Sequence, residues 1–326
     1  RATICDGVDV ENRCLIDMRE GEIIEYLTAR FDGAQPAEHR VIGDDGAIFT
    51  HCSPVVAVAD AMVESVHFER SFSPPWAVGH KLVTVNVSDI AAMGGRPTRG
   101  LFTLSAPKHL EWSWLRRLID GVADASAQYG MRVVGGDVTG SPGPISLSFT
   151  LLGELVGSTV FRREAARLGD IVYVSGPLGD AGLGLQALTT GAPDPKDVES
   201  AVRAFHSPNA RVDIASDLAQ WGGCLCAMDI SDGLIHDALR LAQASGVDLE
   251  IQVDSIPISS TLRRQPERYH DLALTGGEDY QLLFTCAQPP PVDAVAIGRV
   301  IEGTGSVSYF KRGAPYSPKG SGFAHF

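Results

Sequence analysis

The sequence predicts an α/β protein, with some α+β character, that is built from two domains. Three observations support this class. Apolar strand-like runs alternate with long amphipathic segments, the alternation starts again near residue 160, and 44% of the 326 residues are hydrophobic. A chain of this length has room for two cores, and such alternation is typical of layered α/β domains. We therefore expect an arm over residues 1–20, a first domain over residues 21–157 and a second over residues 158–326.

The first domain opens with a helix. Ile23, Ile24, Leu27 and Phe31 recur at helical spacing within residues 21–31, so one apolar face is expected to pack inward. Proline introduces the next helix and a glycine pair ends it. The remaining elements of this domain are helices expected over residues 76–93 and 111–129, and strands expected over residues 41–49, 55–60, 99–107, 131–137 and 145–155.

The second domain repeats the same kinds of element without repeating the sequence. The strand expected over residues 170–176 leads directly into a helix, and CLCAMD leads from a strand into the turn ISDG. No period of 20–50 residues recurs, which excludes a solenoid. The other elements are helices expected over residues 178–190, 196–206, 211–221 and 234–246, strands near 247–253, 279–286 and 294–301, and a final hairpin.

The charge balance excludes several classes of partner. Lys+Arg 27 against Asp+Glu 40 gives a net charge of −13, which argues against a nucleic-acid partner because such binding needs basic side chains. No apolar run is long enough to span a membrane and no signal-peptide pattern opens the chain, so we expect a cytoplasmic protein without a membrane partner. The six cysteines lack disulfide or metal spacing, which predicts reduced, buried thiols.

Acidic residues mark the ends of strands and the glycine turns. A single aspartate at such a place is more often a turn former or a helix cap than a ligand. Six or more of them indicate a ligand site, because so many carboxylates need cations and Mg²⁺ prefers carboxylate oxygen. These residues are Asp44, Asp45, Asp60, Asp89, Asp137, Asp229, Asp232, Glu278 and Asp279.

The common phosphate-binding and hydrolase motifs are absent from the sequence. Neither GxxxxGK[ST] nor GxGxxG occurs, and the glycine-rich segment LGDAGLGLQ at residues 178–186 lacks the dinucleotide-binding spacing. We interpret that segment as close packing between a helix and a sheet. No GxSxG or HExxH is present either. Magnesium held by aspartates therefore remains the best route by which an acidic chain would bind ATP.

Six segments of the chain form a recognisable set. In order, they are IGDDGAIF, VNVSDIAAMGGRP, VVGGDVT, RREAARLGD, MDISDGL and LTGGEDYQLLF. Together they resemble the thiamine monophosphate kinase family, which belongs to the aminoimidazole ribonucleotide synthetase superfamily, and the resemblance covers residues 21–326. It implies the two-domain α/β fold of that superfamily, with the N-terminal sheets of two subunits pairing in a homodimer, and ATP-dependent phosphorylation of thiamine monophosphate to thiamine diphosphate.

The resemblance also assigns residues. The nucleotide contacts fall on Gly136, Asp137, Arg163 and Ser231. The acceptor side falls on His67 and Glu278. Two of these have simpler alternatives: His67 as a capped loop histidine and Arg163 as an ordinary surface cation. The magnesium ligands fall on Asp45, Asp60, Asp89, Asp137, Asp229 and Asp232.

Two departures from the family pattern concern ligand binding. Val58-Ala59 stand where the family has Ser-Thr beside a magnesium site, so two hydroxyl ligands are missing. Pro318 stands where the family has a Trp that stacks on thiamine, and Tyr316 is the nearest aromatic replacement. Three alternatives remain open: thiamine monophosphate kinase, a related kinase for another small acceptor, and a catalytically silent nucleotide-binding dimer. Retention of all six aspartates favours an enzyme.

Overall fold

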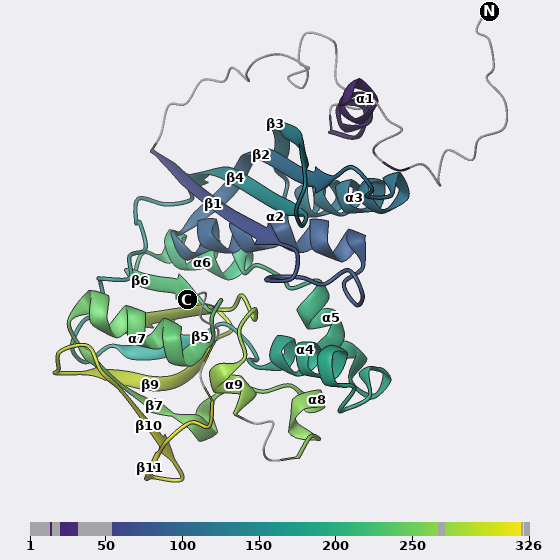
Figure 1. The fold of residues 1–326 in the computed structure, drawn as a ribbon. Helices are drawn as coiled ribbons and strands as arrows, with labels where there is room; N and C mark the ends of the chain where they lie inside the picture. Colours follow the sequence, from purple (N-terminus) through teal and green to yellow (C-terminus); the bar gives the residue numbers. More distant parts are fainter. Residues whose placement is uncertain (1–13, 15–19, 32–53, 267–270, 321, 323–326) are drawn as a thin grey trace, which may run out of the picture. The chain divides into compact units, whose positions relative to one another are not determined.

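A computed structural model describes Cys14 and residues 20–31, 54–266, 271–320 and 322 (Figure 1). It divides into two compact units, which are considered separately. The first unit contains the described residues of 1–50, 59–83 and 99–150, and the second those of 51–58, 84–98 and 151–326. The strand expected over residues 41–49 lies outside the described residues, as does the predicted ligand Asp45 within it. The domain boundary at residue 157 stays a prediction.

A four-stranded sheet has the strand order β1-β4-β2-β3. Its strands are β1 (Val55–Val63), β4 (Ser146–Leu155), β2 (Gly95–Pro107) and β3 (Arg132–Ser141). Every one of them overlaps a strand expected from the sequence. The parallel pairing of β2 with β3 sets Thr103 opposite Asp137, which fixes one predicted ligand in a known register.

Helices α2 (Pro75–Ala92) and α3 (Trp112–Gln128) pack closely in the first unit because two glycines lie at their contact. A Cβ atom at Gly79 would lie 2.0 Å from the Leu118 carbonyl oxygen, and one at Gly121 would lie 2.0 Å from the Trp76 carbonyl oxygen. Neither position accepts a side chain without the helices moving apart. Both helices were predicted.

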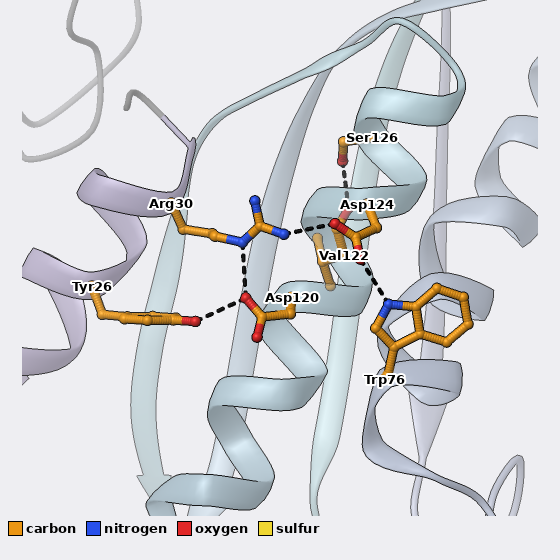
Figure 2. Close-up of polar contacts among 7 residues, drawn as sticks. All are labelled: Tyr26, Arg30, Trp76, Asp120, Val122, Asp124 and Ser126. Carbon is orange, nitrogen blue, oxygen red and sulfur yellow. Dashed lines mark hydrogen bonds and ion pairs between the residues drawn. The ribbon is translucent and has the colours of Figure 1, made fainter. Parts of the chain in front are cut away.

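Helix α1 (Glu20–Phe31) docks on α3 through a polar contact on the surface of the first unit (Figure 2). Tyr26 Oη and Arg30 Nε each donate to Asp120 Oδ1 at 2.8 Å, and Arg30 Nη2 donates to Asp124 Oδ1 at 2.7 Å. Ile23 and Leu27 are buried, as the helical spacing predicted.

The second unit contains a seven-stranded sheet with the order β11-β10-β7-β9-β5-β8-β6. Side chains of β5 alternate between two apolar clusters, Val172 and Val174 in one and Tyr173 in the other, so both faces are covered. The strands are β5 (Ile171–Val174), β6 (Cys226–Asp229), β7 (Asp248–Gln252), β8 (Leu282–Cys286), β9 (Val295–Ile301), β10 (Val307–Lys311) and β11 (Ala314–Tyr316).

Four main helices cover this sheet. Helices α4, α5 and α7 contribute to the cluster that contains Val172, and α6 to the cluster that contains Tyr173. The helix expected over residues 196–206 divides into the 3₁₀ turn η4 (Pro195–Val198) and α5. Short helices not predicted from the sequence are η5 (Val253–Ser255), α8 (Ser260–Arg263) and α9 (Leu272–Thr275). They are too short to show a helical period. The main helices are α4 (Asp180–Thr190), α5 (Glu199–His206), α6 (Val212–Trp221) and α7 (Leu234–Ser245).

Two strands begin later than expected. Strand β8 starts at Leu282 rather than near residue 279, because Glu278 (φ 67°) and Tyr280 (φ 49°) adopt the left-handed conformation and cannot join a ladder. Strand β6 starts at Cys226, so Cys224 lies before it, although both thiols are buried. The two cysteines are therefore not successive positions on one strand.

The described cysteines form no disulfide. Cys224, Cys226 and Cys286 are buried, as expected, while Cys14 is half-buried and makes an isolated β-bridge with Glu111. Residues 1–20 were expected to be a loosely held arm. Of these residues the structure describes Cys14 and Glu20, and Glu20 is the first residue of α1. Among the described helices, none has the length and apolar character needed to cross a membrane.

Candidate functional site

The turn after β6 carries the densest set of predicted site residues in the second unit. Asp229 ends the strand and is 3% exposed, and the Ser88 hydroxyl donates to its Oδ2 at 2.7 Å. Burial raises the pKa of Asp229, whereas the Ser88 hydrogen bond and the Arg163 guanidinium act to lower it. Ser88 directly precedes Asp89, so the segment SDI comes close to the segment DISDG. Ser88 was not predicted, although its place before a predicted ligand was a usable signal.

The side chain of Asp237, in the first turn of α7, holds the backbone of this turn. Its Oδ2 accepts the amides of Ser231 and Asp232, both at 3.0 Å. Arg240 Nη1 lies 2.8 Å from Asp237 Oδ1 and 2.5 Å from Asp232 Oδ2, bridging the two carboxylates. Burial, followed by the charges of Asp229 and Asp232, raises the pKa of Asp237 to about 7. Neither Asp237 nor Arg240 was among the predicted site residues.

The GGEDY loop packs against the same turn. The Glu278 amide donates to the Ser231 carbonyl at 2.7 Å, and the Tyr280 amide donates to the Ile230 carbonyl at 2.9 Å. A Cβ atom at Gly277 would lie 2.5 Å from the Ser231 carbonyl oxygen, so only glycine permits this approach. Glu278, predicted on the acceptor side, is therefore held beside Ser231, predicted on the nucleotide side.

Asp279 ties the GGEDY loop to the start of α4. Its carboxylate is almost fully buried and accepts the Gly179 amide at 2.8 Å. Burial raises the pKa of Asp279 well above its usual range, against the opposing effect of the Gly179 and Ala181 amides. The glycine-rich segment 178–186 was expected to pack closely between a helix and a sheet, but the nearest neighbours of its glycines belong to α5 and to the α9 segment. A Cβ atom at Gly184 would lie 2.2 Å from the Ala201 carbonyl oxygen of α5. Gly179 and Gly182 would place Cβ atoms within 3 Å of the α9 segment.

Arg163 lies on the segment that leads toward β5. Its carbonyl oxygen accepts the Ser245 hydroxyl at 2.7 Å and the Cys226 thiol at 3.6 Å, which anchors its backbone beside β6 and α7. The side chain is exposed, yet it is close enough to Asp229 to act on its pKa. Arg163 is therefore a surface cation that faces an anionic cluster.

The first unit carries Asp60 and Asp137 on exposed positions of β1 and β3. Both were expected at the end of a strand, but they lie inside one, because β1 continues to Val63 and β3 to Ser141. Gly136 precedes Asp137, and a Cβ atom there would lie 1.6 Å from the Phe102 carbonyl oxygen, so this glycine is required for strand pairing. His67 Nδ1 accepts the Val63 amide at 3.1 Å. That contact is the capped loop histidine of the simpler alternative, and it leaves the predicted acceptor role of His67 untested.

The Tyr316 side chain makes contacts with two other side chains of the second unit. Its hydroxyl donates to Asp271, and Lys311 Nζ lies 5.2 Å from the centre of its ring. Asp271 also lines a cavity of about 340 Å³, together with residues of α4 and α9. One face of the Tyr316 ring is therefore covered by a cation. The full lining is Gln186, Thr190, Ala192, Asp271, Leu272, Thr275 and Lys319.

The described residues contain no cage of three His, Cys, Asp or Glu side chains that would hold a metal. Mg²⁺ typically takes one or two carboxylates together with waters and substrate phosphates. Asp229 and Asp232 suit such a role. Their mutual repulsion acts to raise the pKa of Asp229, so added positive charge would stabilise both.

Comparisons with known proteins identify the family of this chain. Residues 43–155 match the family "AIR synthase related protein, N-terminal domain", and residues 167–311 match its C-terminal domain. Thiamine-monophosphate kinase of Aquifex aeolicus is 42% identical over 298 residues, which cover 89% of this chain and 94% of that protein.

Solved structures are similar over nearly the whole chain. One described as AaThiL complexed with AMPPCP and TMP has a TM-score of 0.76 at 37% identity and covers 95% of this chain and 99% of that one. Thiamine-monophosphate kinase from Stenotrophomonas maltophilia has a TM-score of 0.78 at 32% identity, over 92% of this chain and 98% of that one. This chain therefore belongs to the thiamine-monophosphate kinase family of ATP-dependent phosphotransferases.

Proposed function

We propose that this chain transfers a phosphoryl group from ATP to thiamine monophosphate and so makes thiamine diphosphate. The main support is the 37%-identical solved relative that binds AMPPCP, an ATP analogue, and TMP together. Its likeness spans 95% of this chain.

The geometry of the second unit suits phosphoryl transfer. That reaction needs little covalent help from the protein, and catalysis is mostly positioning and neutralisation of charge. The Ser231 backbone is fixed by Asp237 and by the GGEDY loop, which limits how far a bound phosphate would shift. Arg163 adds a cation on the exposed side of the same cluster.

Magnesium is the cofactor that the donor set supports. We propose several Mg²⁺ ions, with Asp45, Asp60, Asp89, Asp137, Asp229 and Asp232 as their ligands; Asp45 lies outside the described residues. When bound, Mg²⁺ would neutralise charge on the transferred group. Val58 and Ala59 supply no side-chain oxygen, so the site near Asp60 would rest on carboxylates and water.

His67, Glu278 and Tyr316 are the residues we propose on the acceptor side. Glu278 is the best supported, because two backbone hydrogen bonds and a left-handed φ hold its loop beside Ser231. The contacts of Tyr316 with Asp271 and Lys311 favour a second candidate, a kinase with an altered acceptor. In that case the stacking lost with Pro318 would not be replaced.

A homodimer is the expected assembly. The four-stranded sheet carries exposed apolar side chains, with Val55 41% and Leu101 44% exposed, and a second copy would cover them. Light scattering at micromolar concentration tests this, and a monomer would count against it. Location in the cytoplasm and the absence of other partners stay predictions.

The activity is tested by incubating the full chain with γ-labelled ATP, MgCl₂ and thiamine monophosphate. Labelled thiamine diphosphate is expected. A parallel panel of other phosphorylated metabolites tests the altered-acceptor candidate. If ATP binds but thiamine monophosphate neither reacts nor binds at millimolar concentration, thiamine monophosphate is not the acceptor.

A further inference from the structure

Asp237 is a buried carboxylate that the proposed reaction does not use directly. It is 0% exposed, although it sits only one turn into α7. A buried carboxylate is costly unless its oxygens are hydrogen-bonded. Both carboxylate oxygens of Asp237 accept hydrogen bonds. The donors are the amides of Ser231 and Asp232, in the turn of residues 230–233, and the guanidinium of Arg240.

The pattern of these contacts is specific to the turn. Oδ2 accepts two consecutive amides, those of Ser231 and Asp232, from a segment that precedes the helix. Two amides directed at one oxygen fix the orientation of both peptide planes. This orientation determines where the Ser231 and Asp232 side chains leave the backbone.

Arg240 extends this control to a side chain. Its Nη1 contacts Asp237 Oδ1 and Asp232 Oδ2, so the Asp232 carboxylate is held by a cation that Asp237 itself positions. The Arg240 side chain is 46% exposed, whereas the two carboxylates are 0% and 19% exposed. The buried Asp237 side chain is therefore the fixed member of this group, and the more exposed Arg240 side chain is positioned by its ion pair with Asp237.

We propose that Asp237, acting through the Ser231 and Asp232 amides and through Arg240, is a positioning residue for magnesium–nucleotide binding. This inference rests on the proposed function, because Ser231 and Asp232 are its nucleotide contact and metal ligand. Outer partners of metal ligands commonly change metal affinity by about 10–100-fold when they are removed.

The test compares Asp237→Asn with the unsubstituted full-length chain. Asn keeps the size of the side chain, but its amide group would face the Arg240 donors, so the three contacts cannot all persist. By calorimetry, the Kd for magnesium–AMPPCP is expected to rise at least about tenfold. In chelator, without metal or nucleotide, hydrogen exchange of the Ser231 and Asp232 amides is expected to accelerate.

Asp170→Asn is the matched control. Asp170 is also buried (6% exposed) in the second unit and accepts the Arg167 amide and the Thr285 hydroxyl, both at 3.0 Å. The Asp170→Asn substitution is expected to lower the melting temperature, while the Kd for magnesium–AMPPCP stays within about twofold of that of the unsubstituted chain. An equal loss of affinity in both variants would mean that Asp237 acts only through general stability, which overturns the proposal.

Other outcomes are equally decisive. A folded Asp237→Asn variant with unchanged nucleotide affinity overturns the positioning role alone. If the unsubstituted chain does not bind magnesium–AMPPCP, the proposed function fails and this inference fails with it. Should Asp237→Asn not fold, Arg240→Gln replaces it, with an expected rise in Kd of at least threefold, and an unchanged Kd overturns the proposal.

Discussion

Two regions use the same residue types with different physical results. On the surface of the first unit, Arg30 joins α1 to Asp120 and Asp124 of α3, whose side chains are 34% and 50% exposed (Figure 2). In the second unit, the carboxylates of Asp237 and Asp279 are buried, and they accept backbone amides. Aspartate pairs with arginine in both regions. In the second region, aspartate carboxylates also accept hydrogen bonds from backbone amides.

The difference shows why an inventory of ion pairs is a poor guide to what holds this protein together. An exposed pair contributes about 0–1 kcal/mol, because water competes for both charges. A buried carboxylate that satisfies amides cannot be removed without leaving donors unpaired, at about 1–3 kcal/mol for each buried group. The buried carboxylates also shape the loops that carry the proposed site, so their loss should affect function as well as stability.

The largest effect is expected for Asp279→Ala. The substitution removes the acceptor of the Gly179 amide, and with it the link that holds the GGEDY loop, in which Glu278 and Tyr280 have left-handed φ angles. The free energy of unfolding should therefore fall by about 3 kcal/mol. Urea denaturation measures this. Asp120→Ala at the α1–α3 contact is the control, and an equal loss there would remove the contrast between the two regions.

Asp279→Asn should change how stability depends on pH. Because burial raises the pKa of Asp279 in the folded chain, the folded state binds its proton more tightly than the unfolded state. The contribution of Asp279 therefore falls as pH rises from about 4 toward the folded-state pKa. Relative to the unsubstituted chain, the Asn variant should lose less stability between pH 4 and 8. Unfolding free energies measured by urea denaturation between pH 4 and 8 test this. If the free energies of the variant and of the unsubstituted chain change with pH in parallel, the prediction is contradicted.

Asp89→Asn should weaken binding of ATP in the presence of Mg²⁺ by about 10–100-fold while leaving the fold intact. The substitution removes a charge but almost no volume, directly after the serine that holds Asp229. Calorimetry with Mg²⁺ and then with chelator measures this, and Asp137→Asn is expected to behave alike. The control is Asp217→Asn, an exposed aspartate on α6. Equal ATP affinity with and without metal would rule out the magnesium bridge.

Tyr316→Ala should raise the KM for thiamine monophosphate about fivefold and leave the KM for ATP nearly unchanged. Loss of aromatic stacking costs about 1 kcal/mol, which corresponds to that factor. Steady-state kinetics with each substrate varied in turn measures both constants. Phe at this position, which keeps the ring but not the hydroxyl bonded to Asp271, should retain most of the affinity. If Ala and Phe are equally impaired, stacking is not the role of Tyr316.

The smallest effect is expected for Arg30→Ala, at less than about 1 kcal/mol of unfolding free energy. The pair is exposed, so the effect should shrink further in 1 M salt, where charges are screened within about 3 Å. Urea denaturation at low and high salt measures it. If the unfolding free energy instead fell by about 3 kcal/mol, and salt did not change that loss, the α1–α3 contact would behave like the buried carboxylates.

The sequence by itself predicted the elements whose local pattern is strong. The helix over residues 21–31 followed from Ile23 and Leu27, which are buried, and the pairs of prolines and glycines bounded α2 correctly. The six motif segments identified the family. These features are readable because each depends on neighbours within a few positions of the chain.

The tertiary structure alone decided which carboxylates hold the loops. Ser88 and Asp229 are 141 positions apart, and Gly179 and Asp279 are 100 apart. Asp237 accepts amides only five and six positions before it, yet in the sequence it looks like an ordinary helix residue, because no local pattern shows that its side chain is buried. Hydrogen-bond partners of a buried carboxylate are selected by distance in space, and no local period in the chain records that distance.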